Sequence, residues 1–203
     1  MAQSLTKSLS FQDFLEQYPN QSGKYELING EMVEMRATRG HDNVARFISK
    51  AFDREVERLG LNYVVDRNIL IKTTTSEGKE QGRIPDVSVV NKTLWNNNIS
   101  DYNALTEPLQ LAVEVTSNNW ETDYLDKFEE YQRLGIAEYW IIDYQAIASV
   151  KYLGTPKIPT IFVYYLVNNQ YEITRFTADN YLVSLTFPQL RLTVNQIINS
   201  QIA

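Results

Sequence analysis

Two apolar stretches, IPDVSVV at residues 84–90 and LQLAVEVTS at residues 109–117, each carry one carboxylate. Asp86 lies near the start of the first stretch, and Glu114 lies near the end of the second. A short apolar run between turn residues indicates a buried β-strand. A carboxylate in such a strand is costly unless it is paired or binds a cation. If the two strands are neighbours in one sheet, Asp86 and Glu114 meet at one edge of that sheet.

Helical spacing of apolar residues predicts two long amphipathic helices, at residues 42–59 and 121–134. A glycine follows each of them, as is common where a helix ends. Shorter helices are expected near the two ends of the chain, at residues 10–18 and 193–199. The chain therefore alternates helices with groups of strands.

The dipeptide Asn29-Gly30 between two short alternating runs predicts a β-hairpin over residues 24–35. Residues 73–82, TTTSEGKEQG, are expected to form a polar loop. The remaining strands are expected at residues 63–65, 68–72, 84–90, 109–115, 137–143, 147–153, 160–167, 170–176 and 180–186. This order predicts an α/β (α+β) fold with a mixed central β-sheet flanked by helices, and with β-hairpins at both ends of the chain.

The length of 203 residues favours a single domain. Its core is expected at about residues 24–143, and a C-terminal β extension is expected at residues 147–203. No apolar run reaches the roughly 18 residues of a membrane span. The N-terminus lacks the apolar segment of a secretory signal, so a cytoplasmic protein is expected.

The composition removes several kinds of site. With no cysteine and one histidine, the chain cannot build a thiolate or multi-histidine metal site. It also lacks the glycine patterns of phosphate loops and dinucleotide folds, so no nucleotide cofactor is expected. The net charge of −6 argues mildly against a protein that coats nucleic acid. Carboxylates remain as the ligands for a metal ion.

Asp86 and Glu114 are therefore candidate ligands of Mg²⁺ or Mn²⁺, which prefer oxygen ligands. The alternative is that Asp86 caps a turn and Glu114 pairs with an arginine or lysine. In the second long helix, Asp123, Lys127 and Tyr131 recur every four residues and share one stripe. Lys127 could reach a phosphate oxygen, or it could form an ordinary Asp–Lys pair on a solvent face. The residues alone leave both choices open.

Several further motifs occur in a fixed order. They are YELINGE at 25–31, His41, RIPDV at 83–87, VEVTS at 113–117, Asp123, Lys127, Tyr131, Gly135 and EYWIID at 138–143. In order and spacing, across about residues 11–143, these motifs resemble the Uma-type restriction endonuclease family, which is similar to the PD-(D/E)XK nuclease superfamily.

The resemblance implies that Asp86 and Glu114 bind the metal ion, with the carbonyl group of Val115 as a further ligand. The superfamily's usual lysine comes two residues after the acid, where this chain has Thr116. The resemblance implies that Lys127 takes its place from the following helix.

Five further residues are candidates for the predicted site, and two of them, Glu31 and Glu26, are alternatives. Glu31 or Glu26 would be the additional N-terminal acid. Arg83 could grip a phosphate bidentately or serve as a charge partner for the carboxylates. His41 opens a helix, where a neutral, structural role is the alternative to contact with substrate. Tyr131 is placed on the substrate side of the site.

The resemblance implies a Mg²⁺- or Mn²⁺-dependent endonuclease that hydrolyses DNA. Two alternatives remain: a catalytically inactive module that binds DNA or protein, and a nuclease acting on RNA or small phosphodiesters. A homodimer is expected, because cutting both strands needs two sites. The segment from Trp95 to Tyr102 and the C-terminal strands are its candidate interfaces.

Overall fold

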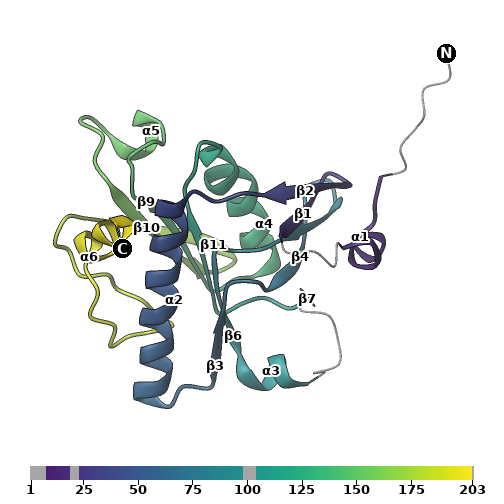
Figure 1. Cartoon of the computed structure of the whole chain (residues 1–203), viewed down its shortest axis with the longest axis horizontal. Helices are drawn as coiled ribbons and strands as arrows, with labels where there is room; N and C mark the ends of the chain where they lie inside the picture. Colours follow the sequence, from purple (N-terminus) through teal and green to yellow (C-terminus); the bar gives the residue numbers. More distant parts are fainter. Residues whose placement is uncertain (1–7, 19–22, 98–103, 203) are drawn as a thin grey trace.

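The computed structural model describes residues 8–18, 23–97 and 104–202 (Figure 1). The helical elements are α1 (Phe11–Gln17), α2 (Arg39–Leu59), α3 (Lys92–Asn96), the π-helical turn η1 (Thr122–Asp126), α4 (Lys127–Leu134), α5 (Val150–Leu153), α6 (Val194–Asn199) and the 3₁₀ turn η2 (Ser200–Ile202). The strands are β1 (Lys24–Ile28), β2 (Glu31–Met35), β3 (Tyr63–Asp66), β4 (Leu70–Thr74), β5 (Glu80–Arg83), β6 (Val87–Asn91), β7 (Ala104–Leu105), β8 (Leu111–Val115), β9 (Glu138–Asp143), β10 (Thr160–Val167) and β11 (Gln170–Thr177).

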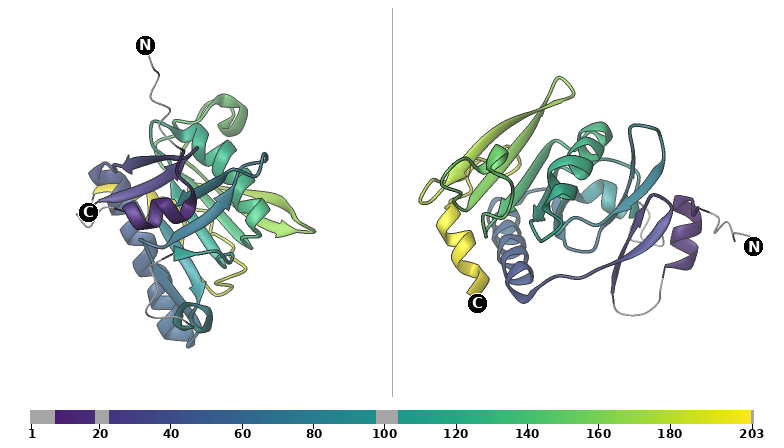
Figure 2. Two further views of the ribbon diagram at one scale, coloured as in Figure 1. Left: turned by 90° about the vertical axis from the view of Figure 1, so that its right-hand side faces the viewer. Right: turned by 90° about the horizontal axis from the view of Figure 1, so that it is seen from above.

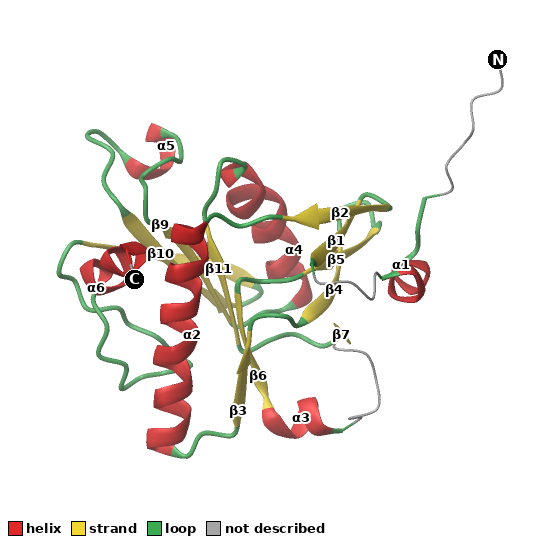
Figure 3. Ribbon diagram, viewed as in Figure 1, coloured by secondary structure: helices red, strands yellow, loops and turns green. Residues whose placement is uncertain are grey.

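The strands form two mixed sheets, which Figure 3 shows in yellow. The larger has the order β11-β10-β9-β8-β6-β3, with β8 and β9 parallel and the other pairs antiparallel. The smaller has the order β2-β1-β5-β4-β7, with β4 and β7 parallel. The predicted α+β class is confirmed, and the N-terminal hairpin belongs to the second sheet.

Helices α2 and α4 cover opposite faces of the larger sheet (Figure 2). On β9, Trp140 packs in the cluster that contains Phe52 of α2, whereas Tyr139 packs in the cluster that contains Tyr131 of α4. Successive side chains of a strand point to opposite faces. Every residue of β9 is buried, as its near-continuous apolar sequence predicts.

The predicted helices and the N-terminal hairpin are confirmed. Helix α2 begins earlier than expected, at Arg39, because the side chain of Thr38 caps it by accepting a hydrogen bond from the His41 backbone. Asn29 and Gly30 have positive φ angles of 54° and 83°, which suit the tight turn between β1 and β2. Among the described residues, no helix is both long and apolar enough to cross a membrane.

The polar loop predicted at residues 73–82 is shorter, because β4 extends to Thr74 and β5 begins at Glu80 and pairs with it. On β5, Gln81 and Arg83 are buried, and Gln81 accepts a hydrogen bond from the backbone of Asn29 at 2.9 Å. The predicted strand at residues 84–90 is shorter, since Pro85 lacks an N–H group and the chain passes there from the smaller sheet to the larger.

Two predicted C-terminal strands are also wrong. Residues 147–153 contain the helical turn α5, because the Asp143 carboxylate accepts hydrogen bonds from the backbones of Ile147 and Ala148 and closes a turn. Residues 180–186 make only an isolated bridge, between Tyr181 and Thr193. Strands β10 and β11 agree with the prediction.

Candidate active site

Asp86 and Glu114 lie on adjacent strands at one edge of the larger sheet. Val87 of β6 is opposite Val113 of β8 in an antiparallel pair, so Asp86 and Glu114 follow as the next opposite residues. The Asp86 carboxylate accepts a hydrogen bond from the Val115 backbone at 2.8 Å. The sequence prediction that the two carboxylates share one edge is therefore supported by the register.

Lys127 enters the same space from α4. Its Nζ lies 2.8 Å from Glu114 Oε2, 3.4 Å from Asp123 Oδ1 and 3.8 Å from Glu26 Oε1. The lysine is 4% exposed, so the alternative of a solvent-facing Asp–Lys pair is wrong. The ammonium instead joins carboxylates from two sheets and one helix.

A π-helical turn precedes Lys127. The backbone N–H of Lys127 donates to the carbonyl of Thr122, five residues earlier, instead of four as in an α-helix. Such turns are rare and occur often at functional sites. The turn adds one residue to the helical turn that precedes α4. Asp123 and Lys127 lie on the same side of it, with their charged atoms 3.4 Å apart.

Tyr131 and Thr116 have different roles in the structure. The Tyr131 hydroxyl donates to Glu114 Oε1 at 2.6 Å, and Tyr131 is fully buried. Tyr131 is thus placed to position Glu114 and not to meet a substrate directly. The Thr116 hydroxyl donates at 3.3 Å to the carbonyl of Ile142. The side chain at position 116 is therefore engaged with β9, and Lys127 is the cation beside Glu114.

Burial dominates the ionisation of the acids around Lys127. Burial raises the pKa of Glu114 to about 8, because the nearby charge of Lys127 offsets it only in part. Burial likewise raises the pKa of Asp123 to about 6. Burial alone would lower the pKa of Lys127, but Glu114 and the neighbouring acids raise it well above its ordinary value. Lys127 is therefore protonated beside Glu114 and Asp123, whose ionisation burial opposes.

His41 pairs with the other candidate ligand. Its Nε2 lies 3.0 Å from Asp86 Oδ2. Burial alone would lower the pKa of His41, but the hydrogen bond and charge of Asp86 raise it overall. Burial alone would raise the pKa of Asp86, but His41 lowers it. The contact with Asp86 thus raises the pKa of His41, although the start of a helix favours a neutral imidazole.

Arg83 is placed as a charge partner. Its guanidinium makes a bidentate contact with Glu130, at 2.8 Å from Nε and 2.7 Å from Nη2, and reaches Glu26 at 3.2 Å. Arg83 is 2% exposed. A phosphate cannot reach this guanidinium, so the alternative of a phosphate-gripping arginine is wrong.

Glu31 does not join the site; it lies exposed at the start of β2. Glu26 of β1 does join it, fully buried, and accepts a hydrogen bond from the Ile84 backbone at 3.0 Å. Of the two glutamates considered for the additional acid, the structure brings only Glu26 to Lys127.

The chain matches a known protein family. The sequence model of the Uma2 family, described as "Putative restriction endonuclease", matches residues 11–195. The chain belongs to the Uma2 family. No protein in the curated set matches the chain.

One solved structure similar to this Uma2-family chain is a "putative nuclease belonging to DUF820" from Anabaena variabilis. The TM-score is 0.71 at 16% sequence identity, and the match covers 95% of this chain and 99% of the other. At this identity the likeness establishes a shared fold. The restriction-endonuclease-like fold expected from the sequence is thereby confirmed.

The donor set of this Uma2-family chain fits a hard divalent cation. Within the described residues, no three acid or imidazole groups already form a metal-binding cluster. Mg²⁺, however, is usually held by one or two carboxylates, with water and substrate phosphates completing its shell. Asp86 and Glu114 supply two such carboxylates.

Sequence reasoning missed the cations that lie around Asp86. The Lys24 ammonium donates to the carbonyl of Arg67. The Arg67 guanidinium donates to the carbonyl of Asp86 at 3.3 Å and to the carboxylate of Asp42 at 2.6 Å. These residues lie in β1, in α2 and in the turn after β3, so no local pattern in the sequence could have connected them.

Proposed function

We propose that this Uma2-family chain is a metal-dependent endonuclease that hydrolyses DNA phosphodiester bonds, with a PD-(D/E)XK-type site. One observation carries the proposal: Lys127 lies 2.8 Å from Glu114, and Glu114 lies opposite Asp86 on the neighbouring strand. An acid pair with a lysine is the set of groups that the resemblance predicted. Family membership supports the nuclease class.

Asp86 and Glu114 would hold Mg²⁺ or Mn²⁺, with the carbonyl oxygen of Val115 as a further ligand by analogy with the superfamily. A divalent cation bound there supplies activation of water and neutralisation of phosphate charge. The side chain of Asp86 is 17% exposed, whereas that of Glu114 is 3% exposed. Substrate would therefore approach from the side of Asp86.

Lys127 acts as a fixed positive charge. Its raised pKa keeps it protonated, so it donates hydrogen bonds and does not remove a proton. Because it is buried, it would act on the transition state through its electrostatic field and not by contact with the phosphate. Tyr131 and Glu26 position Glu114 and Lys127 by the contacts described above, and Arg83 holds Glu26 in place.

A catalytically inactive binding module is the second candidate. It is favoured by one observation: His41 and Lys127 already pair with the two candidate ligands, Asp86 and Glu114. A module of this kind needs no divalent cation. Calorimetric titration with Mn²⁺ separates the two candidates, since the nuclease binds the ion and the Asp86→Asn variant does not.

Nicking of supercoiled plasmid DNA tests the activity. With Mg²⁺ or Mn²⁺ the wild type is expected to nick the plasmid, and Asp86→Asn and Glu114→Gln are expected to be inactive. Glu77→Gln, at an exposed turn, is a matched control. Equal cleavage by all four proteins would remove the site assignment. Labelled RNA and a chromogenic phosphodiester in the same assay test the other substrate classes.

The chain is also proposed to act as one domain and as a homodimer, so that two sites can cut both strands. Trp95 lies half-buried in α3, and Tyr102 lies outside the described residues. In the C-terminal part, Tyr181, Val183 and Leu185 are 58%, 58% and 67% exposed. Light scattering of the wild type and of Val183→Ser/Leu185→Ser tests the dimer and this surface together.

A further inference from the structure

The buried cations of the site leave the substrate's phosphates without an accessible partner. Lys127 and Arg83 are 4% and 2% exposed, and both are committed to buried carboxylates. DNA carries one negative charge per phosphate, and proteins bind it chiefly through accessible lysine and arginine side chains. Binding of a DNA strand at Asp86 therefore requires other cations near this residue.

Three other cations lie near Asp42 and Asp86. Arg67 donates to Asp42 at 2.6 Å and also to the Asp86 carbonyl. Arg46 of α2 pairs with the same Asp42 carboxylate. Lys24 of β1 donates to the carbonyl of Arg67. Asp42 thus pairs with Arg67 and Arg46, and Lys24 is joined to them through the Arg67 carbonyl.

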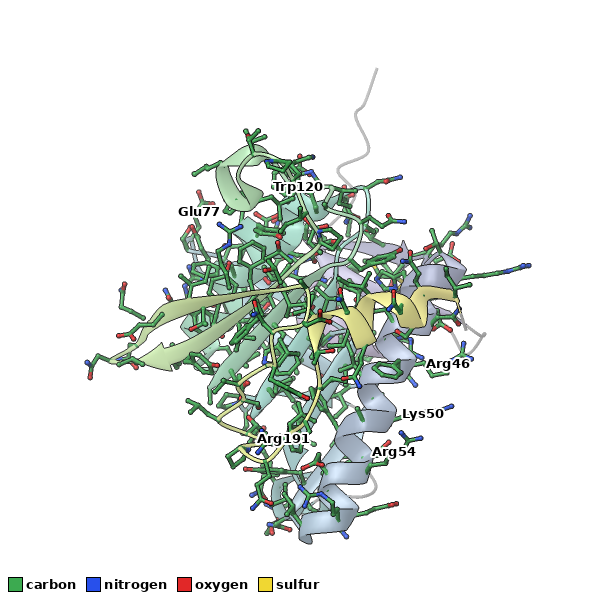
Figure 4. All side chains as sticks on the ribbon, turned by 90° about the vertical axis from the view of Figure 1, so that its left-hand side faces the viewer. Arg46, Lys50, Arg54, Glu77, Trp120 and Arg191 are labelled. Atoms are coloured by element: carbon green, nitrogen blue, oxygen red, sulfur yellow. The ribbon has the colours of Figure 1, made fainter. Side chains whose placement is uncertain are left out.

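The positive charge continues from Arg46 along the outer face of α2. Arg46, Lys50 and Arg54 follow one another every four residues and are all exposed (Figure 4). From each of these residues to the next, a step of four residues, the helix rises about 6 Å. One strand of B-form DNA advances about 3.4 Å per phosphate, so each step is close to two phosphates.

Of the four acids of α2, Asp53 and Glu57 are exposed on the same face as these cations, and the other two are paired. Asp42 pairs with Arg46 and Arg67, and Glu55 pairs with Arg58 at 2.7 Å. Lys50 and Arg54 have no ion-pair partner in the part of the chain that the structure describes. The buried face of the same helix carries His41, which contacts Asp86. On the outer side, Arg67 links Asp42 of α2 to the backbone of Asp86, so a chain of contacts leads from Arg46 to the site.

We propose that Lys24, Arg67, Arg46, Lys50 and Arg54 form one track that binds the phosphate backbone of duplex DNA and leads it past Asp86. This inference rests on the proposed function, since it assumes that the substrate is DNA. The contacts are to phosphates, so the track confers affinity without sequence preference.

Fluorescence anisotropy with a labelled DNA duplex in EDTA measures the track without cleavage. The wild type is expected to bind with an affinity that falls steeply as salt rises. In Lys50→Gln/Arg54→Gln, the slope of log affinity against log salt concentration is expected to decrease by about two, with weaker binding at every salt concentration.

The matched control is Lys79→Gln/Arg133→Gln, which removes the same charge elsewhere. Arg133 lies on α4, across the sheet from α2, and Lys79 lies in the turn that contains Glu77, far from Lys50 in Figure 4. This control is expected to bind as the wild type does. Unchanged binding by Lys50→Gln/Arg54→Gln, equal loss in the control, or tighter binding of RNA than of DNA would each overturn the inference. Failure of plasmid nicking with normal binding would instead count against the proposed function alone.

Discussion

The ammonium nitrogen of Lys127 lies 2.8 Å from the Oε2 atom of Glu114, in a space from which solvent is almost entirely excluded. Lys127 comes from the helix after the strand, whereas the superfamily's usual position, two residues after the acid, is held by Thr116. Lys127 thus lies beside Glu114, as the sequence resemblance implied. The charge reaches the acid from a different backbone position.

Replacement of Lys127 by methionine is expected to reduce plasmid cleavage to background. The change also leaves Glu114 and Asp123 buried without their shared cation, so the free energy of unfolding should fall by about 3–5 kcal/mol. Nicking rates and urea denaturation measure the two effects. Lys127→Arg keeps the charge and should recover stability more than activity. Cleavage at the wild-type rate by Lys127→Met would show that the lysine has no part in the reaction.

Arg83→Met is expected to destabilise the protein strongly and not to act through substrate binding. It breaks the bidentate contact with Glu130 and the contact with Glu26, both within the core. A loss of about 3–5 kcal/mol is expected in urea denaturation, because buried acids lose their partner. Arg133→Gln, an exposed control, should change stability by less than about 0.5 kcal/mol. A variant of normal stability with a raised KM for DNA would restore the phosphate-binding role.

The two glutamates of the N-terminal hairpin are expected to differ sharply. Glu26→Gln removes a charge that balances Arg83 and lies 3.8 Å from Lys127, so both stability and cleavage should fall. Glu31→Gln alters an exposed side chain and should leave both unchanged. Thermal unfolding and nicking assays on the two variants decide the matter. The opposite ranking would place Glu31 at the site.

The sequence predicts the two candidate metal ligands better than the residues that hold them in position. Asp86 and Glu114 stand out because each interrupts an apolar strand, and neighbouring strands bring them together. The hairpin pattern shows which residues of β1 and β2 alternate, but it does not show that Glu26, and not Glu31, faces α4. That choice depends on how the smaller sheet packs against α4.

Two further features depend on packing between distant segments. The sequence leaves open whether Arg83 binds a phosphate or pairs with the carboxylates, and only its contacts with Glu130 and Glu26 show that it is buried in the core. The π-helical turn before Lys127 has no signature in the apolar spacing, because the pattern is compatible with a regular helix. The strand β5 was missed since its polar side chains are buried by specific hydrogen bonds.

Metal binding is expected to strengthen as pH rises. With its pKa raised to about 8, Glu114 carries a proton below that pH, and a bound cation must displace it. Mn²⁺ affinity should therefore increase between about pH 6.5 and pH 8, with release of close to one proton per ion near pH 7. Calorimetry in buffers of different ionisation enthalpy counts the protons. Glu114→Gln should abolish the release; an affinity independent of pH would mean that Glu114 is not a ligand.

A crystal structure of the wild-type protein soaked with Mn²⁺ tests the proposed metal site most directly. Anomalous density is expected between the carboxylates of Asp86 and Glu114, bonded to an oxygen of each, with Lys127 still within contact distance of Glu114. The same soak of Asp86→Asn is expected to lack the peak. Wild-type crystals that show no peak at this position, from protein that cleaves DNA with Mn²⁺ in solution, would contradict the site.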